Sequence, residues 1–164
     1  MSNEKSSSPL APVIPAGLTV RVVGQGGVGG IVARYAATFL ASLEEETRLV
    51  LIDGDAFERR NQERMLFAAT GNKAEVTRRE LLTYFADSRL SMLAIDQYLD
   101  EENIGRLLPE GPEQVVILCV DNHATRKLVS DYCEGRNGWP GLADICLLSG
   151  GNDGVGEDAG GRQL

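Results

Sequence analysis

The chain has 164 residues, a length that suits a single domain with a hydrophobic core. Its formal net charge of −8 and pI of about 4.7 argue against nucleic acid or an anionic membrane as a main partner. No apolar run approaches the roughly 20 residues of a membrane span, and three cysteines without a C-x-x-C pair indicate neither a disulfide framework nor a zinc site. With no secretory signal pattern either, we expect a cytoplasmic protein.

The strongest local pattern is a strand, a glycine turn and a helix in succession. Residues 1–17, rich in Ser, Pro and Ala, come first and predict a flexible N-terminal arm. An apolar strand then ends at Val23, and Gly24, Gly26 and Gly29 follow with the spacing G-x-G-x-x-G. The first glycine permits a tight turn, the second lets a phosphate approach the backbone, and the third lets the helix pack on the strand. The pattern favours nucleotide binding over a purely steric glycine turn.

A second strand and a second helix follow. The strand is predicted at 48–52 and ends at Asp53, where a carboxylate commonly binds ribose hydroxyls or else caps a helix or faces solvent. A polar segment, 54–72, leads to a helix predicted over 72–86. The two helices are each expected to bury the face marked by helical spacing, namely Val28, Ile31, Val32, Tyr35, Ala36, Phe39, Leu40 and Leu43 in the first and Ala74, Thr77, Leu81, Tyr84 and Phe85 in the second.

The second half of the chain continues the alternation of strands and helices. Its elements are predicted as a strand at 91–95, a short helix capped by Asp100, a strand at 114–120, a helix capped by Asn122 and a strand at 144–148. The run at 114–120 is apolar throughout, as strands of parallel sheets are, and it ends at Asp121. That carboxylate either binds a ligand or caps the next helix. The alternation predicts an α/β fold with a doubly wound, mostly parallel, Rossmann-like sheet over 18–150.

The last stretch, 151–164, is rich in glycine and acidic residues and has no apolar period. It predicts a glycine-rich loop, and we expect it to continue into a longer native chain because a further strand would be due next.

The charged residues distinguish two classes of nucleotide. NAD needs only the glycine turn and a ribose acid, whereas a triphosphate also needs cations and a carboxylate that holds Mg²⁺. Arg64 and Lys73 follow Asp53 within reach of phosphates, although either can equally be a solvated surface charge. An NAD-dependent oxidoreductase is the alternative function, but it leaves Arg64, Lys73 and Asp121 without a role.

Five segments in one order resemble the ThiF/MoeB family, which shares its adenylating domain with ubiquitin-activating enzymes. They lie at 24–29, 53–55, 61–64, 71–76 and 119–122. The resemblance implies an enzyme that adenylates a ubiquitin-like or sulfur-carrier protein. The C-terminal glycine carboxylate of that protein would attack the α-phosphorus of ATP. The products would be an acyl adenylate and pyrophosphate.

The resemblance also implies a role for each matching residue. The phosphates of ATP would be bound by Gly24, Gly26, Gly27 and Gly29, and its ribose by Asp53. Further contacts to ATP would come from Asn61, Arg64 and Lys73. Asp121, with Asn122 beside it, would bind Mg²⁺. Asp121, Arg64 and Lys73 would be the catalytic residues. The protein would mainly position the reactants and neutralise charge, because the attacking carboxylate is already ionised.

The resemblance further implies a homodimer that binds its carrier through the carrier's C-terminal tail. Several features depart from the family pattern. Met65 follows Arg64 where the family has glutamine, and no arginine precedes Arg21 to complete a partner's site. A cysteine nucleophile and paired zinc-binding cysteines are absent from these residues. A non-catalytic carrier-binding subunit, or activation of a small-molecule or RNA-borne carboxylate, therefore stays open as an alternative.

Overall fold

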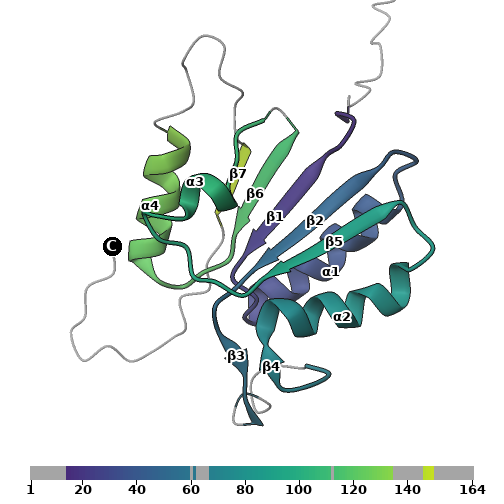
Figure 1. Cartoon of the computed structure of the whole chain (residues 1–164), viewed down its shortest axis with the longest axis horizontal. Coiled ribbons are helices and arrows are strands. Elements are labelled where there is room, and N and C mark those ends of the chain that lie inside the picture. The colour runs from purple at the N-terminus through teal and green to yellow at the C-terminus, as the bar shows by residue number, and fades with distance from the viewer. Residues whose placement is uncertain (1–13, 60, 62–66, 112, 135–145, 150–164) are drawn as a thin grey trace, which may run out of the picture.

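A computed structural model describes residues 14–59, 61, 67–111, 113–134 and 146–149. In this part of the chain, five parallel strands form one sheet in the order β5-β2-β1-β6-β7 (Figure 1). The strands are β1 (Thr19–Val23), β2 (Thr47–Ile52), β5 (Leu90–Ile95), β6 (Gln114–Leu118) and β7 (Cys146–Ser149). The first strand is central and the chain winds outward from it in both directions, so the predicted doubly wound α/β fold is confirmed.

The register of the sheet places the candidate residues side by side. Val23, the last residue of β1, pairs with Ile52 of β2 and with Leu118 of β6. The three strands therefore end level with one another. Gly24 and Asp53, which directly follow two of these ends, lie at the same edge of the sheet, where doubly wound proteins bind their ligands.

Helices cover both faces of the sheet (Figure 1). The helices α1 (Gly27–Ala41) and α2 (Lys73–Phe85) share one core cluster with Val22, whereas α3 (Ile104–Leu107) and α4 (His123–Glu134) share the other with Val23. Adjacent residues of β1 thus pack into the core clusters on opposite faces of the sheet, as the alternation of side chains along a strand requires. No helix in the described part of the chain is long and apolar enough to cross a membrane.

The predicted buried face of α1 is confirmed only in part: Leu40 is buried and Val32, Ala36 and Leu43 pack against the core, but three of its side chains are exposed. Ile31, Tyr35 and Phe39 are 57%, 75% and 49% exposed. The helix instead turns its smallest side chains toward the sheet, since its buried residues are Gly29, Gly30, Ala33, Ala37 and Leu40. Small residues let the helix axis approach the strands closely, and this contact outweighs the burial of the larger apolar side chains on the opposite flank.

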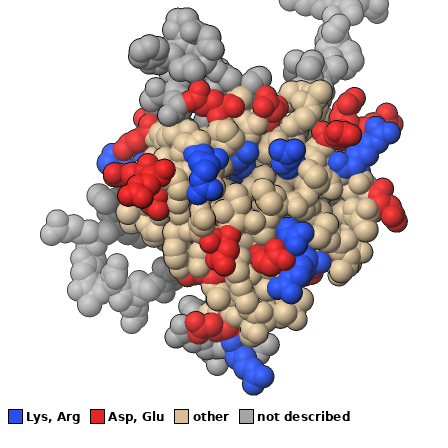
Figure 2. All heavy atoms as spheres, in the orientation of Figure 1, with Lys and Arg blue, Asp and Glu red and all other residues tan. Residues whose placement is uncertain are grey.

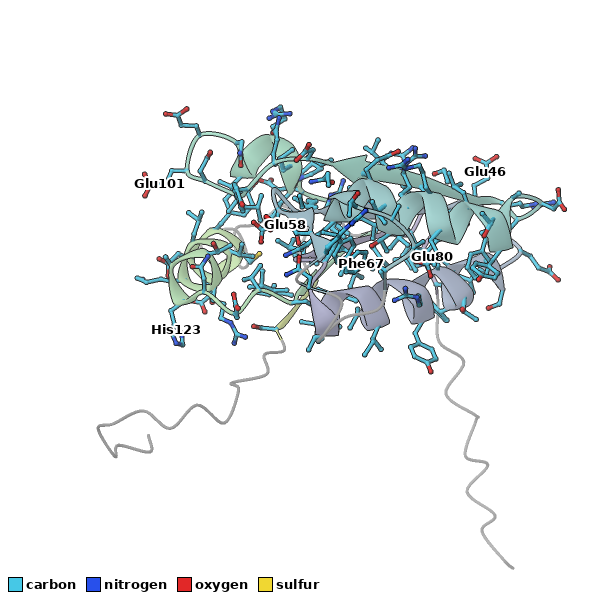
Figure 3. The ribbon with its side chains drawn as sticks, turned by 90° about the horizontal axis from the view of Figure 1, so that it is seen from below. Glu46, Glu58, Phe67, Glu80, Glu101 and His123 are labelled. Carbon is cyan, nitrogen blue, oxygen red and sulfur yellow. The ribbon has the colours of Figure 1, made fainter. Side chains whose placement is uncertain are left out.

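The second helix begins as predicted. The side chain of Asn72 accepts a hydrogen bond from the Glu75 amide and caps α2. Of the residues expected inside, Ala74, Thr77 and Leu81 are buried and Phe85 packs against their cluster, but Tyr84 is 74% exposed, so that part of the prediction is wrong. Glu80 of α2 accepts three hydrogen bonds from the guanidinium of Arg34 on α1, at 2.9, 3.1 and 3.3 Å, and links the two helices (Figure 3).

The polar segment 54–72 contains more order than its sequence predicts. Two short strands, β3 (Ala56–Phe57) and β4 (Gly71–Asn72), pair antiparallel and project from the carboxyl edge of the main sheet (Figure 1). The rings of Phe57 and Phe67 stack with centroids 4.7 Å apart. These contacts bring the chain back to the carboxyl edge of the main sheet, where α2 begins.

The remaining elements agree with prediction except at their ends. Asp100 accepts bonds from the amides of Glu102 and Asn103, so it caps the turn that leads into α3 rather than the helix itself. Asn122 caps α4 through the Thr125 amide. On the face in Figure 2, acidic and basic side chains of the described residues are interspersed over the middle and the edge.

Candidate functional site

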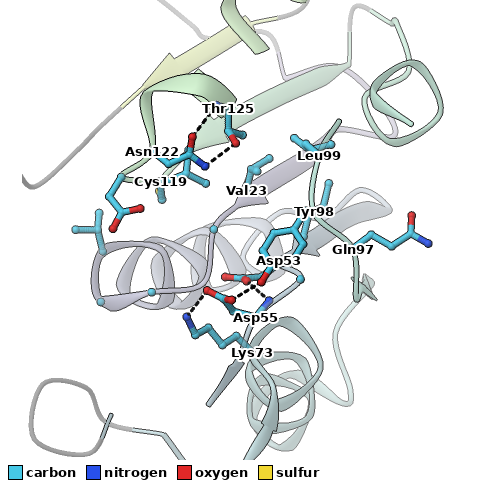
Figure 4. A pocket seen from close by; sticks show the side chains of 18 residues that line it. Val23, Asp53, Asp55, Lys73, Gln97, Tyr98, Leu99, Cys119, Asn122 and Thr125 are labelled. Atoms are coloured by element: carbon cyan, nitrogen blue, oxygen red, sulfur yellow. Dashed lines mark hydrogen bonds and ion pairs between the residues drawn. The ribbon is translucent and has the colours of Figure 1, made fainter. Parts of the chain in front are cut away.

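A cavity of about 410 Å³ opens at the carboxyl ends of β1, β2 and β6. Its walls come from the glycine turn, the segment after β2 together with Lys73, the loop after β5 and the loop after β6 (Figure 4). A volume of this size suits a small-molecule ligand.

The glycines of the turn divide into two kinds. Gly24 has φ +87°, and a Cβ on Gly29 would lie 1.7 Å from the Gly24 carbonyl oxygen, so neither position accepts a side chain without rearrangement. Gly26 and Gly27 differ, because a Cβ there meets no atom within 4 Å and both residues line the cavity. Backbone amides at the start of α1 are thus left open to an anion.

Asp53 ties the glycine turn to the end of β2. Its two carboxylate oxygens accept from the Gln25 amide at 2.6 Å and the Asp55 amide at 2.7 Å. Burial raises the pKa of Asp53, and these two amide donors oppose the rise. Asp53 therefore shapes the turn in addition to lining the cavity, and its oxygens retain lone pairs for ligand hydroxyls.

Lys73, Asp55 and Tyr98 form one hydrogen-bonded group on a wall of the cavity (Figure 4). The Lys73 ammonium donates to Asp55 Oδ2 at 3.0 Å, and the Tyr98 hydroxyl donates to Asp55 Oδ1. The bond from Tyr98 and the neighbouring Lys73 lower the pKa of Asp55, while the same bond raises the pKa of Tyr98. Asp55 is consequently held as a carboxylate.

The loop after β6 supplies the opposite wall, with Asp121 and Asn122. Asn122 caps α4 and its amide donates to Thr125 Oγ1 at 2.8 Å, so Asp121 is not needed as the cap. Cys119 follows the end of β6 and lines the cavity, and burial raises the pKa of its thiol. Cys133 is buried in α4.

The structure brings together most, but not all, of the residues singled out from the sequence. The residues that line the cavity are Gly24, Gly26, Gly27, Asp53, Lys73, Asp121 and Asn122. Gly29 lies behind the turn. Asn61 is not among the described lining residues, and its side chain accepts from the Glu58 amide at 2.8 Å. Arg64, most of the predicted arm and the whole predicted tail fall outside the described residues.

Sequence reasoning gave no role to Asp55 and Tyr98. Asp55 was visible two residues after Asp53, and Tyr98 lies three residues beyond the end of β5 at the ligand-binding edge of the sheet. That position is the signal by which Tyr98 can be found from a predicted strand.

The described lining suits phosphate and the polar part of a nucleotide. Three carboxylates face a single ammonium group there, so a bound triphosphate would require further positive charge. No group of three or more His, Cys, Asp or Glu among the described residues can hold a metal ion alone. A Mg²⁺ ion at Asp121 would therefore take its other ligands from phosphate oxygens and water, as Mg²⁺ commonly does at nucleotide sites.

Comparison with solved structures finds the same fold in E. coli MccB. One structure, of MccB with succinimide, matches with a TM-score of 0.62 and 24% identity over 82% of this chain and 37% of that one. Structures of MccB with ATP, and of the microcin C7 biosynthetic enzyme MccB with N-formylated MccA, each match with a TM-score of 0.56 and 26% identity over 73% of this chain. In both, the match covers 34% of the MccB chain, so this chain spans well under half of its length.

No curated protein sequence matches this one significantly. The sequence model of the ThiF family, in contrast, matches residues 16–150, which include every strand of the sheet and the whole cavity wall described above. The chain belongs to the ThiF family.

Proposed function

We propose that this chain forms the nucleotide-binding part of an adenylyltransferase that uses ATP to activate the C-terminal carboxylate of a peptide or small carrier protein. One observation carries the proposal: a glycine turn with open backbone positions lies between Lys73 on one wall and Asp121 on the other. Family membership and the MccB structures with ATP and AMPCPP support it.

The proposed reaction is a single displacement at phosphorus. A carboxylate oxygen of the substrate forms a bond to the α-phosphorus of ATP as the bond from that phosphorus to the bridging α,β-oxygen breaks. The electron pair of the broken bond leaves with pyrophosphate. Amides of the glycine turn and the Lys73 ammonium would stabilise the phosphate charge, and Asp121 would hold the Mg²⁺ ion that neutralises it further.

As the specific substrate within this class we propose the C-terminal glycine of a ubiquitin-like or sulfur-carrier protein, in a reducing, cytoplasmic setting. The complex of MccB with N-formylated MccA supports a wider class of substrate within the same family. An oxidoreductase that binds NAD is disfavoured, because it would give Lys73 and Asp121 no task at the cavity.

Nucleotide preference tests the proposal first. Calorimetric titration of the chain with ATP and Mg²⁺ is expected to show saturable binding, whereas NAD should give little heat, since its two phosphates use only the turn. Tight NAD binding without a response to ATP would overturn the assignment. Binding of ATP without pyrophosphate exchange in the presence of candidate carriers would favour a non-catalytic subunit.

We further propose that the active unit is a homodimer. The motivation is chemical: the described lining is short of cations for a triphosphate, and a second protomer can supply one. Light scattering of the purified chain is expected to give twice the monomer mass. A monomer with full adenylating activity would exclude a site completed by a partner.

A further inference from the structure

Lys73 is the only cation among the described residues that line the cavity, and its ammonium group is already engaged. It donates to Asp55 Oδ2 at 3.0 Å. The Lys73 side chain is 12% exposed, against 53% for that of Asp55. A phosphate that enters the cavity must therefore compete with the Asp55 carboxylate for the donors of Lys73.

Other contacts hold Asp55 in place when a phosphate takes the Lys73 ammonium away from it. The amide of Lys73 donates to the Asp55 carbonyl at 2.8 Å, and the Asn72 side chain donates to the same carbonyl at 3.1 Å. Its second carboxylate oxygen accepts from the Tyr98 hydroxyl. The ring of Tyr98 lies against Gly54, where a Cβ would come within 2.6 Å of it. The Asp55 carboxylate thus stays in place and keeps its hydrogen bond from Tyr98 if the Lys73 ammonium binds a ligand instead.

We propose that Asp55 is a built-in counter-ion that competes with nucleotide phosphates for Lys73, and that Tyr98 stabilises Asp55 once Lys73 is released. The inference rests on the nucleotide site proposed above. Both residues are positioning residues, because they act through Lys73. The competition makes affinity depend on phosphate charge: a triphosphate displaces the carboxylate, while a nucleoside leaves the ion pair intact.

The variant Asp55→Asn removes the charge and keeps the size and the acceptor oxygen for Tyr98. A single charge acting across one ion-pair distance near a protein surface leads us to expect about tenfold tighter ATP binding. AMP should gain less, and adenosine should not change. If Asp55 instead holds Lys73 in the position that binds ATP, Asp55→Asn would weaken ATP binding, because Lys73 would be displaced.

A second variant tests the role of Tyr98. Tyr98→Phe keeps the ring against Gly54 and removes only the hydroxyl, so ATP binding is expected to weaken about threefold, in the range of one hydrogen bond. Combined with Asp55→Asn, the same change should have much less effect, since the charge that the hydroxyl stabilises is gone.

The titrations use ATP, AMP and adenosine in one buffer, with Asp87→Asn as the matched control. Asp87 is exposed and lies beyond the far end of α2, so its loss changes net charge equally and should leave ATP affinity unchanged. Weaker ATP binding by Asp55→Asn, or an equal gain for adenosine, would overturn the inference while the nucleotide site stands. A wild-type chain that binds neither ATP nor adenosine would instead overturn the nucleotide proposal, and this inference with it.

Discussion

Replacing Asp121 with alanine is expected to slow adenylation by about a hundredfold or more while leaving the domain folded. Asp121 follows β6 and lines the cavity at the edge where the phosphates would lie. Loss of its carboxylate would remove the ligand that we propose for Mg²⁺ and with it charge neutralisation at the α-phosphorus. The fold should survive, because Asp121 is exposed and Asn122 caps α4.

The measurement is exchange of labelled pyrophosphate into ATP in the presence of a carrier or peptide substrate. Circular dichroism and thermal unfolding serve as the folding control. Asp131→Ala is the matched variant, since Asp131 is an exposed carboxylate on α4 that pairs with Lys127 away from the cavity. Exchange by Asp121→Ala at close to the wild-type rate would show that this carboxylate has no part in the reaction.

The second large effect is expected at Gly29. A Cβ there would lie 1.7 Å from the Gly24 carbonyl oxygen and 3.3 Å from the Cys119 side chain. Relieving the first overlap requires the helix and the turn to separate, so Gly29→Ala is expected to lower the free energy of unfolding by roughly 3 kcal/mol. For a chain of this size, such a loss corresponds to a fall of roughly 10 °C in Tm.

Gly26→Ala provides the contrast within the same turn. Gly26 has φ −70°, which alanine adopts readily, and an added Cβ meets no protein atom within 4 Å. The variant should unfold within a few degrees of the wild type but bind ATP about tenfold or more weakly, because the methyl group occupies space at the phosphate-binding turn. Full stability of Gly29→Ala, or normal ATP binding by Gly26→Ala, would contradict the division of these glycines into a packing position and a ligand-facing position.

Much of the fold was predictable because its signals are local. The glycine spacing, the apolar run at 114–120 and the cap at Asn122 each depend on a few neighbouring residues. Strand ends were less predictable: β6 ends at Leu118 rather than at Val120, since its pairing with β1 stops there.

The orientation of α1 shows the limit of such patterns. Periodicity identified the helix but assigned its larger apolar side chains to the core, whereas Ala33 and Ala37 are fully buried and Tyr35 is exposed. A sequence period tells which residues share a flank, but not how close the facing strands will allow a helix to come. That distance follows from how the helix packs against β1 and β2 in the folded sheet.

For the site, the sequence by itself determined the glycine turn and the acids that end the strands, since a parallel sheet brings those ends to one edge. It did not determine which charges meet there. Asp55 pairs with Lys73, 18 residues away, and with Tyr98, 43 residues away. Only the tertiary structure decides such pairs, because strand order and the antiparallel β3–β4 contact bring these three segments to the same wall.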